Sequence, residues 1–123
     1  MAQALLAEAL VFGGHADRAL QELELLAPRV LDVRLEPLLL RLRGCALAQL
    51  GEQPAAAAAI SGSLARAREI GIDYDVAAAL HVLAALDGAD PRAPGWRRES
   101  RALRERLGVV RLATPALSLA LAS

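Results

Sequence analysis

Leucine and alanine recur at spacings of three and four residues along most of the chain, and β-branched runs are very few. That spacing places apolar side chains on one face of an α-helix. We therefore predict six helices, at residues 2–12, 17–27, 34–50, 54–70, 74–86 and 96–107. The pattern thus predicts an all-α fold.

Glycine and acidic residues mark the ends of these predicted helices. Glycine follows the apolar runs at positions 13–14, 51, 71 and 108, where its freedom from a Cβ suits the end of a helix. Asp32 and Asp73 are placed to cap the third and fifth helices. Gly62 lies inside the fourth helix and predicts a bend or a close helix contact. Short turns between the helices predict stacked hairpins.

Two stretches displaced by 37 residues share one pattern. The first has Leu6, Ala7, Leu10, Gly14, Ala19 and Leu23, and the second has Arg43, Gly44, Leu47, Gly51, Ala56 and Ile60. Small side chains at Gly44 and Ala56 allow two helices to approach closely, while large ones beside them fill the space. The third hairpin lacks the full pattern, so we expect it to be degenerate or to act as a cap.

This pattern resembles that of tetratricopeptide-like helical repeat proteins over residues 2–70. The matching positions are Leu40, Gly44, Leu47, Ala56, Ile60 and Ser63. Arg43 departs from the usual leucine, and the repeat is longer than the ~34 residues of that family. The resemblance implies an α-solenoid over residues 1–111 that binds a protein or peptide without catalysis.

A narrower resemblance is to the carboxyl-terminal repeats of actinobacterial signalling ATPases, some linked to a nucleotide cyclase or a LuxR-type DNA-binding domain. It is carried by the stretches LRGCALAQLG, SLARAREIGIDYDVAAALHVLAAL and ALRERLGVVRL. The resemblance implies the sensory or scaffolding end of a larger bacterial regulator in signal transduction. The ATPase itself is not in this chain, because a GxxxxGK phosphate loop needs lysine and the sequence has none.

Composition limits the class of protein further. The 123 residues suit one domain, and the single Cys45 excludes an internal disulfide. The start of the chain lacks the charges of a secretion signal, and no uncharged stretch reaches the ~20 residues of a membrane span. We therefore expect a cytoplasmic protein that does not insert into a membrane.

Few side chains suggest reaction chemistry. Cys45 and His81 are candidates for a thiolate and imidazole pair on neighbouring helices, but no motif supplies an orienting group or an oxyanion site. His15 and Asp17 offer two metal ligands, and a site needs at least a third. We predict no enzyme activity, no metal and no cofactor.

The first helix of each hairpin is expected to line a groove for a peptide. Helical spacing selects Glu8, Val11, Phe12, Arg41, Cys45, Gln49, Tyr74, Asp75 and His81 as the groove residues. The three aromatic residues Phe12, Tyr74 and Trp96 lie far apart in the sequence. They therefore indicate core or hinge anchors rather than a platform for stacking bases.

Charge is divided along the chain although the formal net charge is zero. Residues 1–91 have seven arginines and 12 acids, and residues 92–123 have seven arginines and two acids, giving −5 and +5. The last predicted helix combines an apolar stripe of Trp96, Leu103, Leu107 and Val110 with a basic face of Arg97, Arg98, Arg101 and Arg104. That face fits a solvated surface, an acidic protein partner or, as the alternative function, nucleic acid or another acidic polymer.

The two ends of the chain are apolar. The first predicted helix has little polar face, and solenoids need polar terminal repeats to remain soluble. We therefore expect either a fragment of a longer protein or self-association through the apolar terminal helices. Residues 112–123 form an apolar tail that is expected to be docked or disordered.

Overall fold

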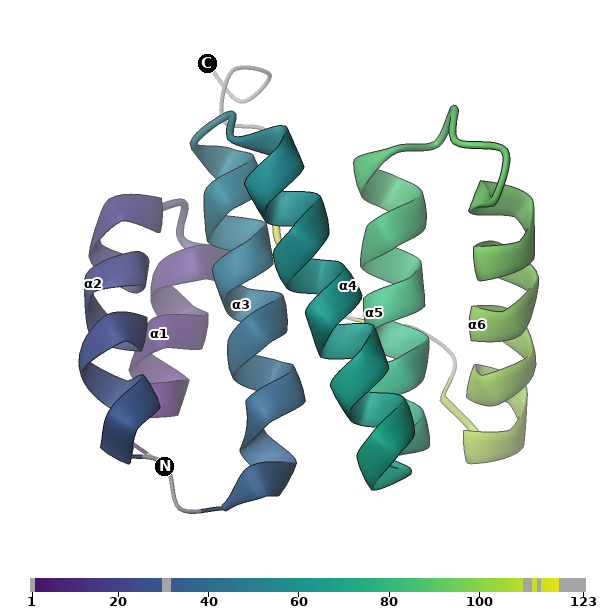
Figure 1. Ribbon diagram of the computed structural model, residues 1–123, viewed down its shortest axis with the longest axis horizontal. Coiled ribbons are helices and arrows are strands. Elements are labelled where there is room, and N and C mark those ends of the chain that lie inside the picture. The colour runs from purple at the N-terminus through teal and green to yellow at the C-terminus, as the bar shows by residue number, and fades with distance from the viewer. Residues whose placement is uncertain (1, 30–31, 110–111, 113, 118–123) are drawn as a thin grey trace.

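Six α-helices follow one another along the residues that the computed structural model describes, which are 2–29, 32–109, 112 and 114–117. The helices are α1 (Ala2–Phe12), α2 (Ala16–Leu26), α3 (Glu36–Gln49), α4 (Gln53–Ile70), α5 (Asp73–Leu86) and α6 (Ala93–Leu107) (Figure 1). Two 3-10 turns, η1 (Ala27–Arg29) and η2 (Val33–Leu35), lie between α2 and α3. The described residues contain no strand, so the predicted all-α class is confirmed.

The helices pack as three hairpins in sequence order. Each helix contacts the next one along the chain. The hairpins are α1 with α2, α3 with α4, and α5 with α6. In addition, α3 packs against both α1 and α5. Figure 1 shows the hairpins side by side, with α2 at one edge of the row and α6 at the other. The first helices of the three hairpins therefore form a continuous surface.

The 37-residue repeat is visible as equivalent positions in the first two hairpins. Gly14 and Gly51 both end a helix with φ of +80°, a conformation that a side chain would strain. Ala19 and Ala56 are both fully buried where the second helix crosses the first. The period found in the sequence thus corresponds to a period in the packing.

One position of the repeat continues into the third hairpin, although His81 and Arg97 stand where the second hairpin has Gly44 and Ile60. Ala93 lies 37 residues after Ala56, begins α6, and is as completely buried as Ala19 and Ala56. The helix begins three residues before the predicted start at Trp96, because Pro94 lies in its first turn and not in a loop. Proline is well suited to the first turn of a helix, where its missing N–H has no partner to lose.

The contact between α3 and α4 depends on Gly44. A Cβ built on Gly44 would lie 2.6 Å from Cγ1 of Ile60 and 3.2 Å from the carbonyl oxygen of Ala56. Gly62 is different, because a Cβ there would meet only Leu40 Cδ1 at 3.9 Å. The expected close contact at Gly62 is therefore wrong, and the close approach is at Gly44.

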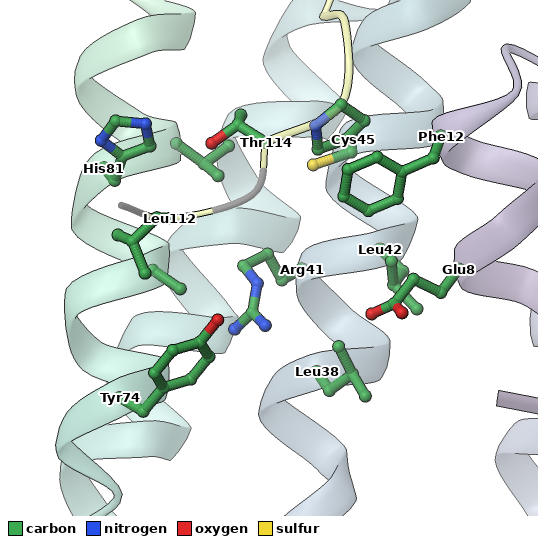
Figure 2. A pocket seen from close by; sticks show the side chains of 13 residues that line it. Glu8, Phe12, Leu38, Arg41, Leu42, Cys45, Tyr74, His81, Leu112 and Thr114 are labelled. Carbon is green, nitrogen blue, oxygen red and sulfur yellow. The ribbon is translucent and has the colours of Figure 1, made fainter. Parts of the chain in front are cut away.

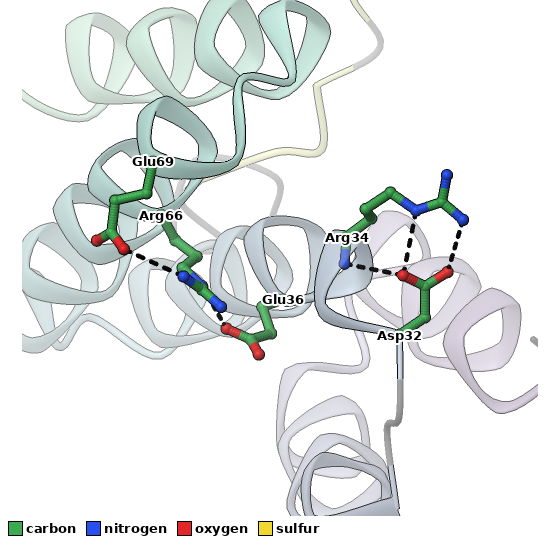
Figure 3. A network of polar contacts seen from close by, with 5 residues as sticks. All are labelled: Asp32, Arg34, Glu36, Arg66 and Glu69. Atoms are coloured by element: carbon green, nitrogen blue, oxygen red, sulfur yellow. Dashed lines mark hydrogen bonds and ion pairs between the residues drawn. The ribbon is translucent and has the colours of Figure 1, made fainter.

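Polar contacts hold the hairpins at their ends (Figure 3). Asp32 accepts a hydrogen bond from the backbone N–H of Arg34 and so caps η2, immediately before α3. Arg66 of α4 forms ion pairs with Glu36 of α3 at 2.6 Å and with Glu69 at 3.1 Å. The predicted cap at Asp73 is wrong, because α5 begins at Asp73 itself and has no side-chain cap.

Candidate functional site

A cavity of about 210 Å³ lies on the surface formed by the first helices (Figure 2). Its walls come from α1, α3 and α5, and from the chain that follows α6. Six of the nine predicted groove residues line it, namely Glu8, Phe12, Arg41, Cys45, Tyr74 and His81. The structure therefore brings side chains from all three predicted groove helices to one place.

The remaining three predicted residues lie beside the cavity and have structural contacts. Val11 is fully buried in the core. Gln49 is also buried, and its Nε2 donates hydrogen bonds to the carbonyl oxygens of Val11 at 2.8 Å and Ala116 at 2.7 Å. Asp75 is paired with Arg41. These three residues therefore belong to the packing between the helices and do not line the cavity.

The ion pair of Arg41 and Asp75 joins α3 to α5 under the groove. Arg41 Nη1 lies 2.9 Å from Asp75 Oδ1, and the two side chains are only 13% and 12% exposed. Because both charges are largely withdrawn from water, each depends on the other for its polar contact. The pair fixes the spacing of two helices that line the groove.

A segment that follows α6 returns to this surface. We call Leu112 and residues 114–117 the return segment. Leu112 and Pro115 are buried, and Leu117 packs against the core beside Leu47. Figure 2 shows Leu112 and Thr114 between the side chains of α5 and those of α3. The described part of the apolar tail is therefore docked in the groove, and residues 118–123 lie outside the described residues.

Several groove residues are not among those predicted from the sequence. Leu38 and Leu42 of α3 line the cavity together with Arg41 and Cys45, to which they are related by helical spacing. That spacing was a signal that could have identified them. The contribution of the return segment had no comparable signal, because its position depends on the path of the chain after α6.

Two aromatic residues belong to the groove and not to the core. Phe12 of α1 and Tyr74 of α5 are each 45% exposed and line the cavity from its two sides. The expectation that they anchor the core is therefore wrong. Trp96 fits the expectation of a core anchor better, since its ring packs against the buried residues of α5 and α6. The guanidinium of Arg92 lies 5.0 Å from the centre of this ring.

Cys45 and His81 both reach the cavity, but their ionisation does not suit a nucleophilic pair. Burial raises the pKa of the Cys45 thiol to about 11, although the positive charge of Arg41 opposes this shift. Burial lowers the pKa of His81, and the charge of Arg104 lowers it further. Near neutral pH both groups are therefore uncharged, whereas nucleophilic catalysis by cysteine uses the thiolate.

We expect the thiol of Cys45 to react with a disulfide reagent at least about 100-fold more slowly in the folded chain than in the urea-unfolded chain at a pH near 8. Raising the pKa from 9.0 to about 11 reduces the thiolate fraction to that extent, and burial slows access further. Absorbance of the released thiol measures both rates. Equal rates would show that the thiol is not buried.

The raised pKa of the Cys45 thiol also makes the stability of the fold depend on pH. Because the folded pKa is the higher one, the unfolded chain loses its thiol proton first as the pH rises. The contribution of Cys45 to stability is therefore complete below pH 9.0 and decreases between 9.0 and about 11. Urea unfolding at several alkaline pH values, with Cys45→Ala as reference, isolates this contribution.

The other candidate ligands lie outside the groove. His15 lies in the turn from α1 to α2, and Asp17 lies in the first turn of α2. Among the described residues, no three histidine, cysteine, aspartate or glutamate side chains come close enough together to hold a metal ion.

The predicted basic face of α6 is not uniform. Arg97, Arg98 and Arg101 are exposed, whereas Arg104 is partly buried and its Nε has no hydrogen-bond partner in the described part of the chain. The four arginines form no ion pairs with described residues, whereas Arg106 on the same helix pairs with Asp73. The apolar stripe is also incomplete: Leu103 is buried and Leu107 is 43% exposed. Val110 lies outside the described residues.

Comparison of the chain with protein-family models, curated proteins and solved structures identified no match. The resemblance to tetratricopeptide-like repeats and to actinobacterial regulators therefore remains a prediction from the residues. None of the helices in the described ranges is long and apolar enough to cross a membrane.

Proposed function

We propose that this chain is a non-catalytic helical-repeat module that binds an extended peptide of a protein partner in the groove between α1, α3 and α5. The proposal extends to a larger bacterial regulator in the cytoplasm, for which the module is the sensory or scaffolding end. That wider context is supported by the sequence resemblance alone. The groove itself is supported by the contacts described above.

The observation that carries the proposal is the hydrogen bond from Gln49 to Ala116. Beside the cavity, one helical turn after Cys45, a buried side-chain amide donates a hydrogen bond of 2.7 Å to the backbone carbonyl of a non-helical segment. Such a contact accepts any residue at that point, because the carbonyl is common to all peptides. Affinity in peptide grooves commonly comes from backbone hydrogen bonds, and specificity comes from the pockets beside them.

The walls favour an apolar peptide without acidic side chains, because Glu8 also lines the cavity. Leu38, Leu42 and Phe12 present apolar surface, and Arg41 is already neutralised by Asp75. An acidic peptide would therefore find no free cation on the floor of the groove among the described residues. The partner that fits best is an extended segment with small and apolar side chains.

A titration of the isotope-labelled full chain with a synthetic peptide of residues 112–117 tests this function, in a chain carrying Leu112→Ser and Leu117→Ser so that its own segment competes little for the groove. We expect changes in the backbone amide resonances of Cys45, Gln49 and His81. The variant Gln49→Met keeps the length of the side chain and removes its amide, so binding should weaken about tenfold, the value of one hydrogen bond. Gln21→Met, on the exposed face of α2, is the matched control.

Two results would contradict the proposal. One is an absence of resonance changes at peptide concentrations in the millimolar range, where a tethered competitor is expected to be overcome. The other is equal binding by the Gln49→Met and Gln21→Met variants, which would show that the peptide does not bind at Gln49.

A second function, binding of nucleic acid or another acidic polymer, is favoured by one observation. Arg97, Arg98 and Arg101 are exposed and have no ion-pair partner among the described residues. A labelled single-stranded oligonucleotide would then bind with an affinity that falls steeply as salt is raised. Peptide binding in an apolar groove should change little over the same range of salt.

A further inference from the structure

The return segment occupies the groove in which we propose that a peptide binds. Leu112, Thr114 and Pro115 line the cavity together with residues of all three first helices. Further along, the carbonyl oxygen of Ala116 accepts the hydrogen bond from Gln49, and Leu117 packs against the core. The segment therefore has the contacts of a bound peptide while belonging to the same chain.

The fit of this segment is incomplete. A cavity of about 210 Å³ remains between the segment and the helices. Two buried polar atoms in this region, Gln49 Oε1 and Thr114 Oγ1, have no hydrogen-bond partner among the described residues. Buried polar atoms in a well-packed core are normally paired, because leaving one unpaired costs about 1–3 kcal/mol.

The helices are joined far more completely than the segment is. Ser63 and Ser100, for example, are buried and donate hydrogen bonds to the carbonyl oxygens of Pro37 and Ala77 in the preceding helices. Among the described residues, the return segment has a single hydrogen bond to the helices, from Gln49. The segment can therefore leave its position at a much lower cost than any helix.

We propose that the return segment is an internal occupant of the peptide groove and that an external peptide of similar chemistry displaces it. This inference rests on the proposed function. The external peptide is extended, has no acidic side chain, carries apolar side chains like those of Leu112 and Pro115, and presents a carbonyl to Gln49. An N–H that reaches Gln49 Oε1 gives such a peptide a contact that the internal segment lacks.

Displacement makes apparent affinity depend on the internal segment. A tethered segment acts at an effective concentration in the millimolar range, so it competes strongly with a free peptide of equal intrinsic affinity. Weakening the segment lowers this competition without altering the groove. The groove of the altered chain should therefore bind free peptide more tightly.

The test compares the full chain with its variant Leu112→Ser/Leu117→Ser, which loses two apolar contacts of the segment. The probe is a fluorescein-labelled peptide of residues 112–117, and fluorescence anisotropy measures its binding. We expect the double variant to bind the peptide about tenfold or more tightly than the unaltered chain, since burial of one leucine contributes more than a tenfold factor. Leu107→Ser, an exposed leucine of α6, is the matched control and should leave binding unchanged.

The reaction rate of Cys45 gives a second measurement. Cys45 shares the cavity wall with Thr114 and Pro115 and is 2% exposed. Release of the segment should speed reaction of its thiol with a disulfide reagent, while far-UV circular dichroism shows that the helices persist. If the double variant loses helix, Thr114→Asp replaces it, because the Oγ1 of this partly buried residue lies in a buried place without a hydrogen-bond partner. A carboxylate there is unfavourable and weakens the segment in the same direction.

Each outcome decides between the two proposals. Tighter binding by the segment variant supports both. Equal peptide affinity of the variant and the unaltered chain overturns displacement and leaves groove binding in place, whereas no binding by either overturns the proposed function and the inference with it. A dimer in light scattering that the double variant loses would assign the occupant to a second copy and overturn the intramolecular form.

Discussion

Replacing Arg41 by alanine is expected to lower the free energy of unfolding by about 3 kcal/mol, because the substitution leaves the carboxylate of Asp75 unpaired in a site that is 12% exposed. The expected loss comes mainly from this uncompensated charge. The attraction within the intact pair is partly cancelled by the cost of removing both groups from water. Urea unfolding followed by far-UV circular dichroism measures the change.

Two further variants test this explanation. Adding Asp75→Asn to Arg41→Ala removes the unpaired charge, so the double variant should be more stable than Arg41→Ala alone. Arg68→Ala breaks the pair with Glu99, whose side chains are 49% and 46% exposed, and should cost less than about 1 kcal/mol. Equal losses for Arg41→Ala and Arg68→Ala would show that burial of the first pair contributes nothing.

The fold was largely predictable because its signals are local. Apolar spacing located all six helices, with the largest error of three residues at the start of α6. The 37-residue period identified positions such as Ala19 and Ala56 that prove equivalent in burial. Asp73 was misjudged as a cap because a cap depends on backbone angles at one residue, which propensity does not determine.

The groove was predictable only in part. Helical periodicity selected Arg41, Cys45 and His81 correctly as neighbours in space, because the first helices of stacked hairpins share one surface. Periodicity could not show that Val11 faces the core, since one helix contacts several neighbours. The sequence does not predict where the return segment docks, because an apolar stretch without helical period has no local signal for where it packs.

The contact between α3 and α4 gives the second large effect. Gly44→Val should lower the free energy of unfolding by about 3 kcal/mol, at the upper end of the usual cost of adding side-chain volume to a packed core. The new Cβ would lie 2.6 Å from Cγ1 of Ile60, which is fully buried in the hydrophobic core. The carbonyl of Ala56, 3.2 Å away, belongs to the backbone of α4 and limits any shift. Urea unfolding again provides the measurement.

Gly62→Ala is the matched control, since Gly62 is also a glycine inside a helix and its added Cβ would meet only Leu40 Cδ1 at 3.9 Å. Alanine favours the helix by up to ~1 kcal/mol over glycine, so this variant should be more stable than the unaltered chain. Because the two glycines have different surroundings, we expect the free energy of unfolding to fall at Gly44 and to rise at Gly62. A loss at Gly44→Val of no more than about 1 kcal/mol would mean that α3 and α4 separate easily, and that close approach at this position is not what holds the second hairpin together.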